Sequence, residues 1–160
     1  MSIKEMNVDY FTTLADSKEW LQDNVEGGAI CPCCERLDKV YNRKIGDATV
    51  RIIFALYKHS QQNVGSYFPI EAFVPDQKYG RDFPILRLID LLERADNDDP
   101  TKKTSGQYRL TEKGANFARG LLAIPERLII YHNELIGVSE NNKFITEFWP
   151  NFNYQELMES

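Results

Sequence analysis

The segment CPCC holds the residues of this chain whose types and spacing point most directly to chemistry. Cys31 and Cys34 have the Cys-Pro-x-Cys spacing of a zinc knuckle, in which two thiolates from one turn bind the metal. A closed tetrahedral zinc site needs four ligands, and Cys33 is the one other cysteine in the sequence. His59 or His132 could complete the site, although neither belongs to a ligand-like pair. Zinc is therefore a candidate cofactor, bound by Cys31 and Cys34 with Cys33 or His59.

Two other interpretations of the cysteines stay open. A thiol–disulfide site of thioredoxin type would use the same spacing, but no βαβ pattern surrounds it. Cysteine also packs as a small buried hydrophobe, in which case Pro32 would simply shape a turn. The second of these interpretations predicts buried thiols.

The remaining polar residues form no recognisable catalytic motif. No serine or cysteine nucleophile motif accompanies His59 or His132, and the chain has no phosphate-binding or dinucleotide-binding glycine motif. Asp96, Asp98 and Asp99 lie close together but lack the spacing, the glycine and the closing glutamate of a calcium loop. We therefore expect a protein that is not an enzyme.

A group of basic side chains in the middle of the chain could contact nucleic acid. They lie in a polar turn, in the helix expected after it, in a loop rich in turn-forming residues, and in the strand that follows. Asp82, Asp90 and Glu93 share the expected helix and would repel phosphate. The candidate DNA-binding residues are Lys78, Arg81, Arg87, Lys102, Lys103 and Arg109.

The elements that must position these residues follow from hydrophobic periodicity. Apolar residues at i, i+3, i+4 and i+7 predict a helix over residues 47–62, capped by Asp47. A short helix at residues 70–74 and a longer one at residues 83–95 follow. Residues 96–106 then form a loop, and a strand leads to a last helix that Thr111 caps. The expected common core is Ile53, Phe54, Leu56, Leu88, Ile89, Leu92 and Phe117.

This order of elements resembles the winged helix-turn-helix superfamily, including MarR-like and PadR-like regulators. Two stretches carry the match, namely Leu-Leu-Glu at residues 91–93 and Leu-Thr-Glu-Lys-Gly at residues 110–114. The resemblance implies that residues 83–95 are the recognition helix and that residues 96–106 are the tip of the wing. It covers residues 47–120 and concerns fold more than function.

The whole chain also resembles a group of small uncharacterised phage and prophage proteins. The matching pieces are the CPCC segment, RLIIYHNELIG and FNYQELM. RLIIY and ELIGV read as two strands joined by a His132–Asn133 turn, and residues 143–158 as two helical turns separated by Pro150. Phe144, Phe148, Trp149 and Phe152 should pack on the core. The resemblance implies an accessory phage protein and carries no known activity with it.

Composition limits the class of protein further. The chain has 160 residues, 42% hydrophobic and 27% charged, which is typical of one globular domain. No apolar run could span a bilayer, and the first residues do not form a signal peptide, so we expect a cytoplasmic protein without membrane contact. The net charge is −5, but residues 35–119 carry 15 basic and 12 acidic side chains, while both flanks are acidic.

These observations predict an α+β fold in a single domain. It comprises an N-terminal extension with the CPCC segment (1–46), a winged helix (47–120) and a C-terminal β-hairpin with its tail (121–160). The first functional hypothesis is a DNA-binding regulator. The alternative is a protein-interaction module that acts on a host protein, for which aromatic residues at 12% and the acidic ends would be suited.

Overall fold

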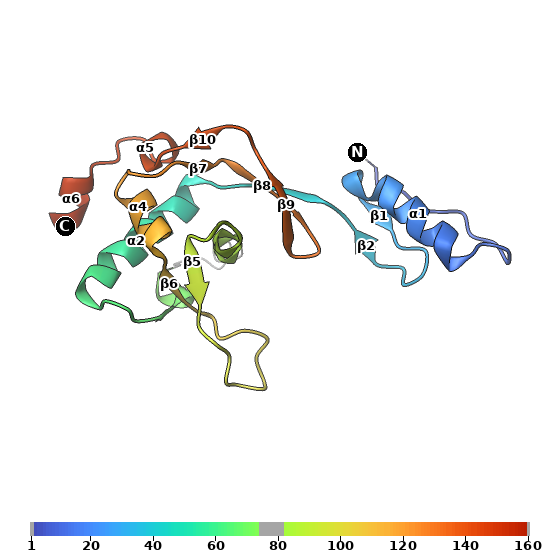
Figure 1. Ribbon diagram of the computed structural model, residues 1–160, viewed down its shortest axis with the longest axis horizontal. Coiled ribbons are helices and arrows are strands. Elements are labelled where there is room, and N and C mark those ends of the chain that lie inside the picture. The colour runs from blue at the N-terminus through green and yellow to red at the C-terminus, as the bar shows by residue number, and fades with distance from the viewer. Residues whose placement is uncertain (1, 74–81, 160) are drawn as a thin grey trace. The chain divides into compact units, whose positions relative to one another are not determined.

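The computed structural model describes residues 2–73 and 82–159, which form an α+β fold of helices, 3₁₀ helices and short strands (Figure 1). Contacts divide the chain into two compact units. Unit 1 comprises Met1–Arg43 and Leu128–Gly137, and unit 2 comprises Lys44–Arg127 and Val138–Ser160. The β-hairpin that we expected in a C-terminal region therefore groups with the N-terminal segment. None of the described helices is long and apolar enough to cross a bilayer.

Unit 1 begins with helix α1 (Leu14–Asn24), which a capping box starts. Thr13 Oγ1 accepts the Asp16 N–H at 3.1 Å, and the Asp16 carboxylate accepts the Thr13 N–H at 3.2 Å. Thr13 is therefore the N-cap of α1, and Asp16 occupies the third helical position. The 3₁₀ helix η1 (Val25–Gly27) follows and leads to a hairpin of β1 (Ala29–Ile30) and β2 (Leu37–Asp38).

A three-stranded sheet completes unit 1, with the strand order β3–β8–β9. Its strands are β3 (Tyr41–Lys44), β8 (Arg127–Tyr131) and β9 (Glu134–Val138). The turn between β8 and β9 has positive φ at both central residues, 49° at His132 and 64° at Asn133. That is the two-residue turn expected from the sequence, and it matches the twist of the two strands.

Unit 2 is built on helix α2 (Asp47–Gln62). Gly46 is its N-cap and Asp47 its first residue, so the helix begins one position earlier than predicted. A sheet with the order β4–β6–β5 comes next, formed by β4 (Phe68–Pro69), β5 (Leu92–Arg94) and β6 (Gln107–Leu110), all paired antiparallel. Helix α4 (Glu112–Ala118) follows β6 directly. Thr111 Oγ1 caps α4 by accepting the Gly114 N–H at 3.0 Å, as the sequence predicted.

The long helix expected at residues 83–95 is wrong. The chain forms a 3₁₀ helix, η3 (Phe83–Ile89), then a left-handed residue at Asp90 with φ 60°, and then strand β5. Leu91 and Leu92 are both buried, and β5 pairs with β6 through Leu92↔Leu110. Pairing and burial on the two faces of a strand therefore outweigh the helical periodicity of the segment. The shorter helix expected at 70–74 is the 3₁₀ turn η2 (Ile70–Ala72), and residue 74 lies outside the described residues.

The C-terminal part of unit 2 closes the core around α2. A pair of short strands, β7 (Ile124–Pro125) and β10 (Asn142–Lys143), precedes α5 (Ile145–Phe148) and α6 (Tyr154–Glu159). The Phe54 ring meets those of Trp149 and Phe152 at centroid distances of 5.9 and 5.4 Å. Phe148 is buried, whereas Phe144 is 43% exposed and was wrongly expected to pack inward. Of the expected core, all residues are buried except Leu88, which is half-buried.

Candidate functional site

The cysteines occupy the turn that joins β1 to β2 in unit 1. The Cys31 N–H donates to the carbonyl of Arg36 at 2.8 Å, and the Glu35 N–H donates to the carbonyl of Cys31 at 2.9 Å. Glu35 takes the left-handed conformation, with φ 61°, that closes the turn. Cys31 is half-buried and Cys33 and Cys34 are exposed, and none of the three forms a disulfide. The interpretation as buried hydrophobes is therefore wrong for Cys33 and Cys34.

Cys31 is the thiol that the turn perturbs most. Hydrogen bonds from the backbone N–H groups of Cys34 and then Cys33 hold the pKa of the Cys31 thiol below its usual value, and the Cys34 side chain adds to the effect. Cys31 also lines a cavity of about 390 Å³ on unit 1, whose other lining includes Met6, Val8 and Pro32. A half-buried thiol with a stabilised thiolate thus faces a hollow on this unit.

A second polar group in unit 1 was not foreseen from the sequence. The Asp38 side chain, 13% exposed, accepts a hydrogen bond from the Tyr131 hydroxyl at 2.7 Å and contacts His132 Nε2 at 2.8 Å. The rings of Tyr131 and His132 stack at a centroid distance of 3.9 Å. Burial raises the pKa of Tyr131 to about 12, and the hydrogen bond and charge of Asp38 act in the same direction. This cluster ties the β8–β9 turn to β2.

Both histidines contact aromatic rings. His132 is held by Asp38 and Tyr131, as described. His59 lies in α2 of unit 2, where its ring meets the edges of Phe68 at 4.5 Å and Phe73 at 5.5 Å. In residues 2–73 and 82–159, no group of three or more His, Cys, Asp or Glu side chains is placed to hold a metal ion. Zinc remains a prediction from the cysteine spacing.

The basic residues of unit 2 divide into engaged and exposed side chains. Arg109, on β6, donates through Nε to Glu93 Oε2 at 2.6 Å and through an Nη to the Gly65 carbonyl at 3.1 Å. Its guanidinium lies 4.5 Å from the centre of the Tyr67 ring, and the bond to Glu93 raises its pKa further. Arg109 is thus occupied in holding β5 and the loop before β4 against β6.

Lys102 and Lys103 are exposed in the loop between β5 and β6, and Arg87 is exposed on η3. The loop is ordered by Asp99, whose carboxylate accepts the Thr101 N–H at 2.9 Å and the Thr101 hydroxyl at 2.7 Å. These bonds lower the pKa of Asp99. Lys78 and Arg81, the candidates in the preceding turn, lie outside the described residues.

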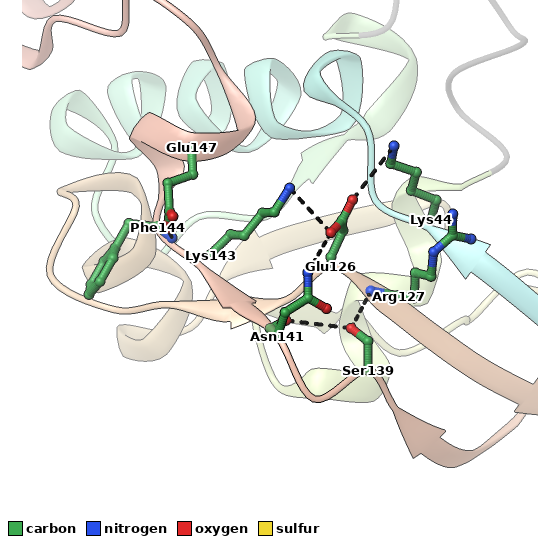
Figure 2. A network of polar contacts seen from close by, with 8 residues as sticks. All are labelled: Lys44, Glu126, Arg127, Ser139, Asn141, Lys143, Phe144 and Glu147. Atoms are coloured by element: carbon green, nitrogen blue, oxygen red, sulfur yellow. Dashed lines mark hydrogen bonds and ion pairs between the residues drawn. The ribbon is translucent and has the colours of Figure 1, made fainter.

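Figure 2 shows a further network in unit 2 that the sequence did not reveal. The Glu126 carboxylate accepts from Asn141 Nδ2 at 2.6 Å and pairs with Lys143 at 3.2 Å and with Lys44 at 3.6 Å. The bond from Asn141, with help from Lys143 and Lys44, lowers the pKa of Glu126. A carboxylate stabilised in this way is a poor proton acceptor, so the network ties three segments together and does not resemble a catalytic base.

Comparison of the chain with protein families, with curated proteins and with solved structures found no match.

Proposed function

We propose that unit 2 is a winged helix and that it binds duplex DNA through η3 and the β5–β6 hairpin. The observation that carries this proposal is the strand order β4–β6–β5, together with the order of elements α2, β4, η2, η3, β5, β6 and α4. In a winged helix, the second strand of the wing lies between two partners. One is the first strand of the wing, and the other is a short strand that follows the first helix. Here β6 lies between β4 and β5, because Tyr108 is paired with Phe68 on one side and with Arg94 on the other. In line with the resemblance, the chain would act as a phage-type accessory regulator.

The charges of the hairpin support contact with phosphate and also limit its strength. Lys102 and Lys103 stand exposed on the loop, where a wing touches phosphate or the minor groove. Arg87 is the remaining described candidate for a base contact, since Arg109 is held by Glu93. Three aspartates share the loop, and the chain carries −5 overall, so binding should be weak and strongly dependent on salt.

The experiment measures DNA affinity against salt concentration. Fluorescence anisotropy on mixed duplexes would be recorded from low to physiological salt for the native protein and for Lys102→Gln/Lys103→Gln. Both lysines are exposed on a loop, so the double variant should fold normally. It should flatten the slope of log affinity against log salt by roughly 2, because two phosphate contacts are lost.

A matched control replaces two exposed lysines that belong to neither the hairpin nor η3, Lys18 in α1 and Lys113 in α4, with the same net change of charge. This control should keep the native slope. A native protein that shows no salt-dependent binding even at low salt would refute DNA binding. Equal losses of slope in both double variants would show a nonspecific charge effect and would refute the role of the hairpin.

A second candidate function, binding of a host protein, rests on a separate observation in unit 1. Tyr10 and Phe11 are adjacent in the sequence and are 96% and 85% exposed, and their rings meet edge to face with a centroid distance of 5.7 Å. Large aromatic side chains in this state are typical anchors of protein interfaces. In pull-downs from nuclease-treated host lysate, the native protein should capture a host protein that the Tyr10→Ser/Phe11→Ser variant no longer captures. Capture that nuclease abolishes, or that the double variant retains, would count against this candidate.

A further inference from the structure

Unit 1 places Cys31 and Cys34 in one closed turn. The hydrogen bond from the Glu35 N–H to the Cys31 carbonyl closes the chain over Cys31–Glu35 into a single turn. In such a turn the Cα atoms three residues apart lie within about 7 Å, which is the range that a disulfide spans. From this geometry we propose that Cys31 and Cys34 form a reversible disulfide by exchange with low-molecular-weight disulfides.

Access to the pair supports exchange. Cys31 lines the cavity of about 390 Å³ with Met6, Val8 and Pro32 and with the carboxylates Glu5 and Glu35, so a small disulfide can approach this residue from solvent. Cys34 is exposed and lies in the same turn. Exchange chemistry needs a reachable thiol and a neighbouring second thiol, and it does not require the βαβ surroundings of thioredoxin.

The neighbours of the pair favour exchange over metal binding. Two of the groups that unit 1 could add as ligands, Asp38 and His132, are bonded to each other at 2.8 Å. Asp38 also holds the Tyr131 hydroxyl at 2.7 Å. Recruiting either group would break this partly buried cluster, whereas forming the Cys31–Cys34 bond leaves it intact.

The reaction conserves atoms and electrons. The Cys31 thiolate attacks one sulfur of glutathione disulfide, the S–S bond of that molecule breaks, and one glutathione leaves as a thiolate. Cys31 then carries the other glutathione as a mixed disulfide. Cys34 releases its proton to solvent and attacks Cys31 Sγ, which expels the second glutathione. The protein loses two electrons and two protons, one proton from each cysteine, and glutathione disulfide is reduced to two glutathiones.

Cys33 supplies the matched control, since it lies in the same turn and is equally exposed. A disulfide between the sequence neighbours Cys33 and Cys34 would close a small, strained ring, which departs from the separation that unstrained disulfides prefer. Cys33→Ser should therefore retain the exchange, and Cys34→Ser should stop it at the mixed disulfide of Cys31.

The test uses the full chain in glutathione buffers of increasing oxidation, with free thiols trapped by N-ethylmaleimide before mass spectrometry. The oxidised native protein should lose two hydrogens, carry one maleimide, and yield a fragment with Cys31 linked to Cys34 and the maleimide on Cys33. Cys33→Ser should oxidise like the native protein. Cys34→Ser should accumulate one glutathionyl group and form an internal disulfide at least roughly tenfold less, because it has lost the neighbouring thiol of high effective concentration.

Other results would overturn the proposal. Three thiols that stay reduced in oxidised glutathione, or that form disulfides between chains only, would do so. A Cys33–Cys34 linkage in the native protein would also contradict it. So would one equivalent of zinc per native chain that thiol modification releases, measured by elemental analysis of protein prepared without chelator. The fragment analysis of the native protein needs no variant, so a variant that fails to fold leaves the test intact.

Discussion

Gly114 gives the sharpest test of how helix α4 packs in unit 2. A Cβ at this position would lie 2.2 Å from the Leu91 carbonyl oxygen and 3.1 Å from Leu110 Cδ2. That oxygen also accepts the Thr111 N–H at 3.1 Å, at the start of α4. Alanine normally stabilises a helix interior by up to about 1 kcal/mol relative to glycine. Here the first contact is with backbone, which cannot move aside without disturbing β5 and the start of α4.

Gly114→Ala should therefore destabilise unit 2. Overpacking costs about 1–3 kcal/mol and the strained Thr111–Leu91 hydrogen bond about 1 kcal/mol more, against the gain in helix propensity. We expect a net loss of about 1–3 kcal/mol. At about 1–1.5 kcal/mol per molar urea for a unit of this size, the midpoint should fall by about 2 M.

The assay is urea unfolding followed by tryptophan fluorescence in a Trp20→Phe background. The remaining Trp149 packs on Phe54 at 5.9 Å and reports on unit 2. Gly46→Ala is the control, since a Cβ there meets nothing within 4 Å, and it should change stability by less than about 1 kcal/mol. A Gly114→Ala protein as stable as the native one, or more stable, would refute the close approach of α4 to Leu91.

Three further predictions concern titration and packing. Ultraviolet titration should show a tyrosine that ionises near pH 12, and this ionisation should be absent from Tyr131→Phe and shifted to lower pH in Asp38→Asn. Because the pKa of Tyr131 is higher in the folded than in the unfolded protein, its contribution to stability holds below about pH 10 and is lost as pH rises toward 12. Glu126 has a lowered folded pKa, so its contribution holds above about pH 4.5 and is lost on further acidification; unfolding midpoints of Glu126→Gln should fall less steeply than native ones between pH 5 and pH 3, and parallel curves would contradict this. Leu92→Ala should cost about 2–5 kcal/mol in urea unfolding and the half-buried Leu88→Ala clearly less, so equal costs would contradict the strand assignment of β5.

Elements that depend on local signals could be predicted from the sequence. The apolar rows of residues 47–62 predicted α2 almost to its ends. Thr111 predicted the start of α4, and the pair His132–Asn133 predicted the turn between β8 and β9. In each case a side chain or backbone preference acts within a few residues, so no distant partner is needed to decide the structure.

The failures come from distant partners. Residues 83–95 have helical periodicity, and only the ladder to β6 makes Leu92 part of a strand. Arg109 was predicted to contact DNA for the same reason, because its ion pair with Glu93 on the neighbouring strand depends on how β5 and β6 pair. The Asp38 cluster could not be predicted from the sequence, because Tyr131 and His132 contact Asp38 only when β2 and the β8–β9 turn come together.

The strand order β3–β8–β9 also has a consequence for synthesis and for truncation. β3 leaves the ribosome first, but its partner β8 follows only after the whole of residues 45–126. The sheet of unit 1 therefore cannot form until most of unit 2 has been synthesised. Deleting the residues up to Arg43 would likewise strip β8 of a neighbour and leave an open sheet edge prone to aggregation. Loss of activity after such a deletion would thus report on the sheet as much as on the cysteine turn.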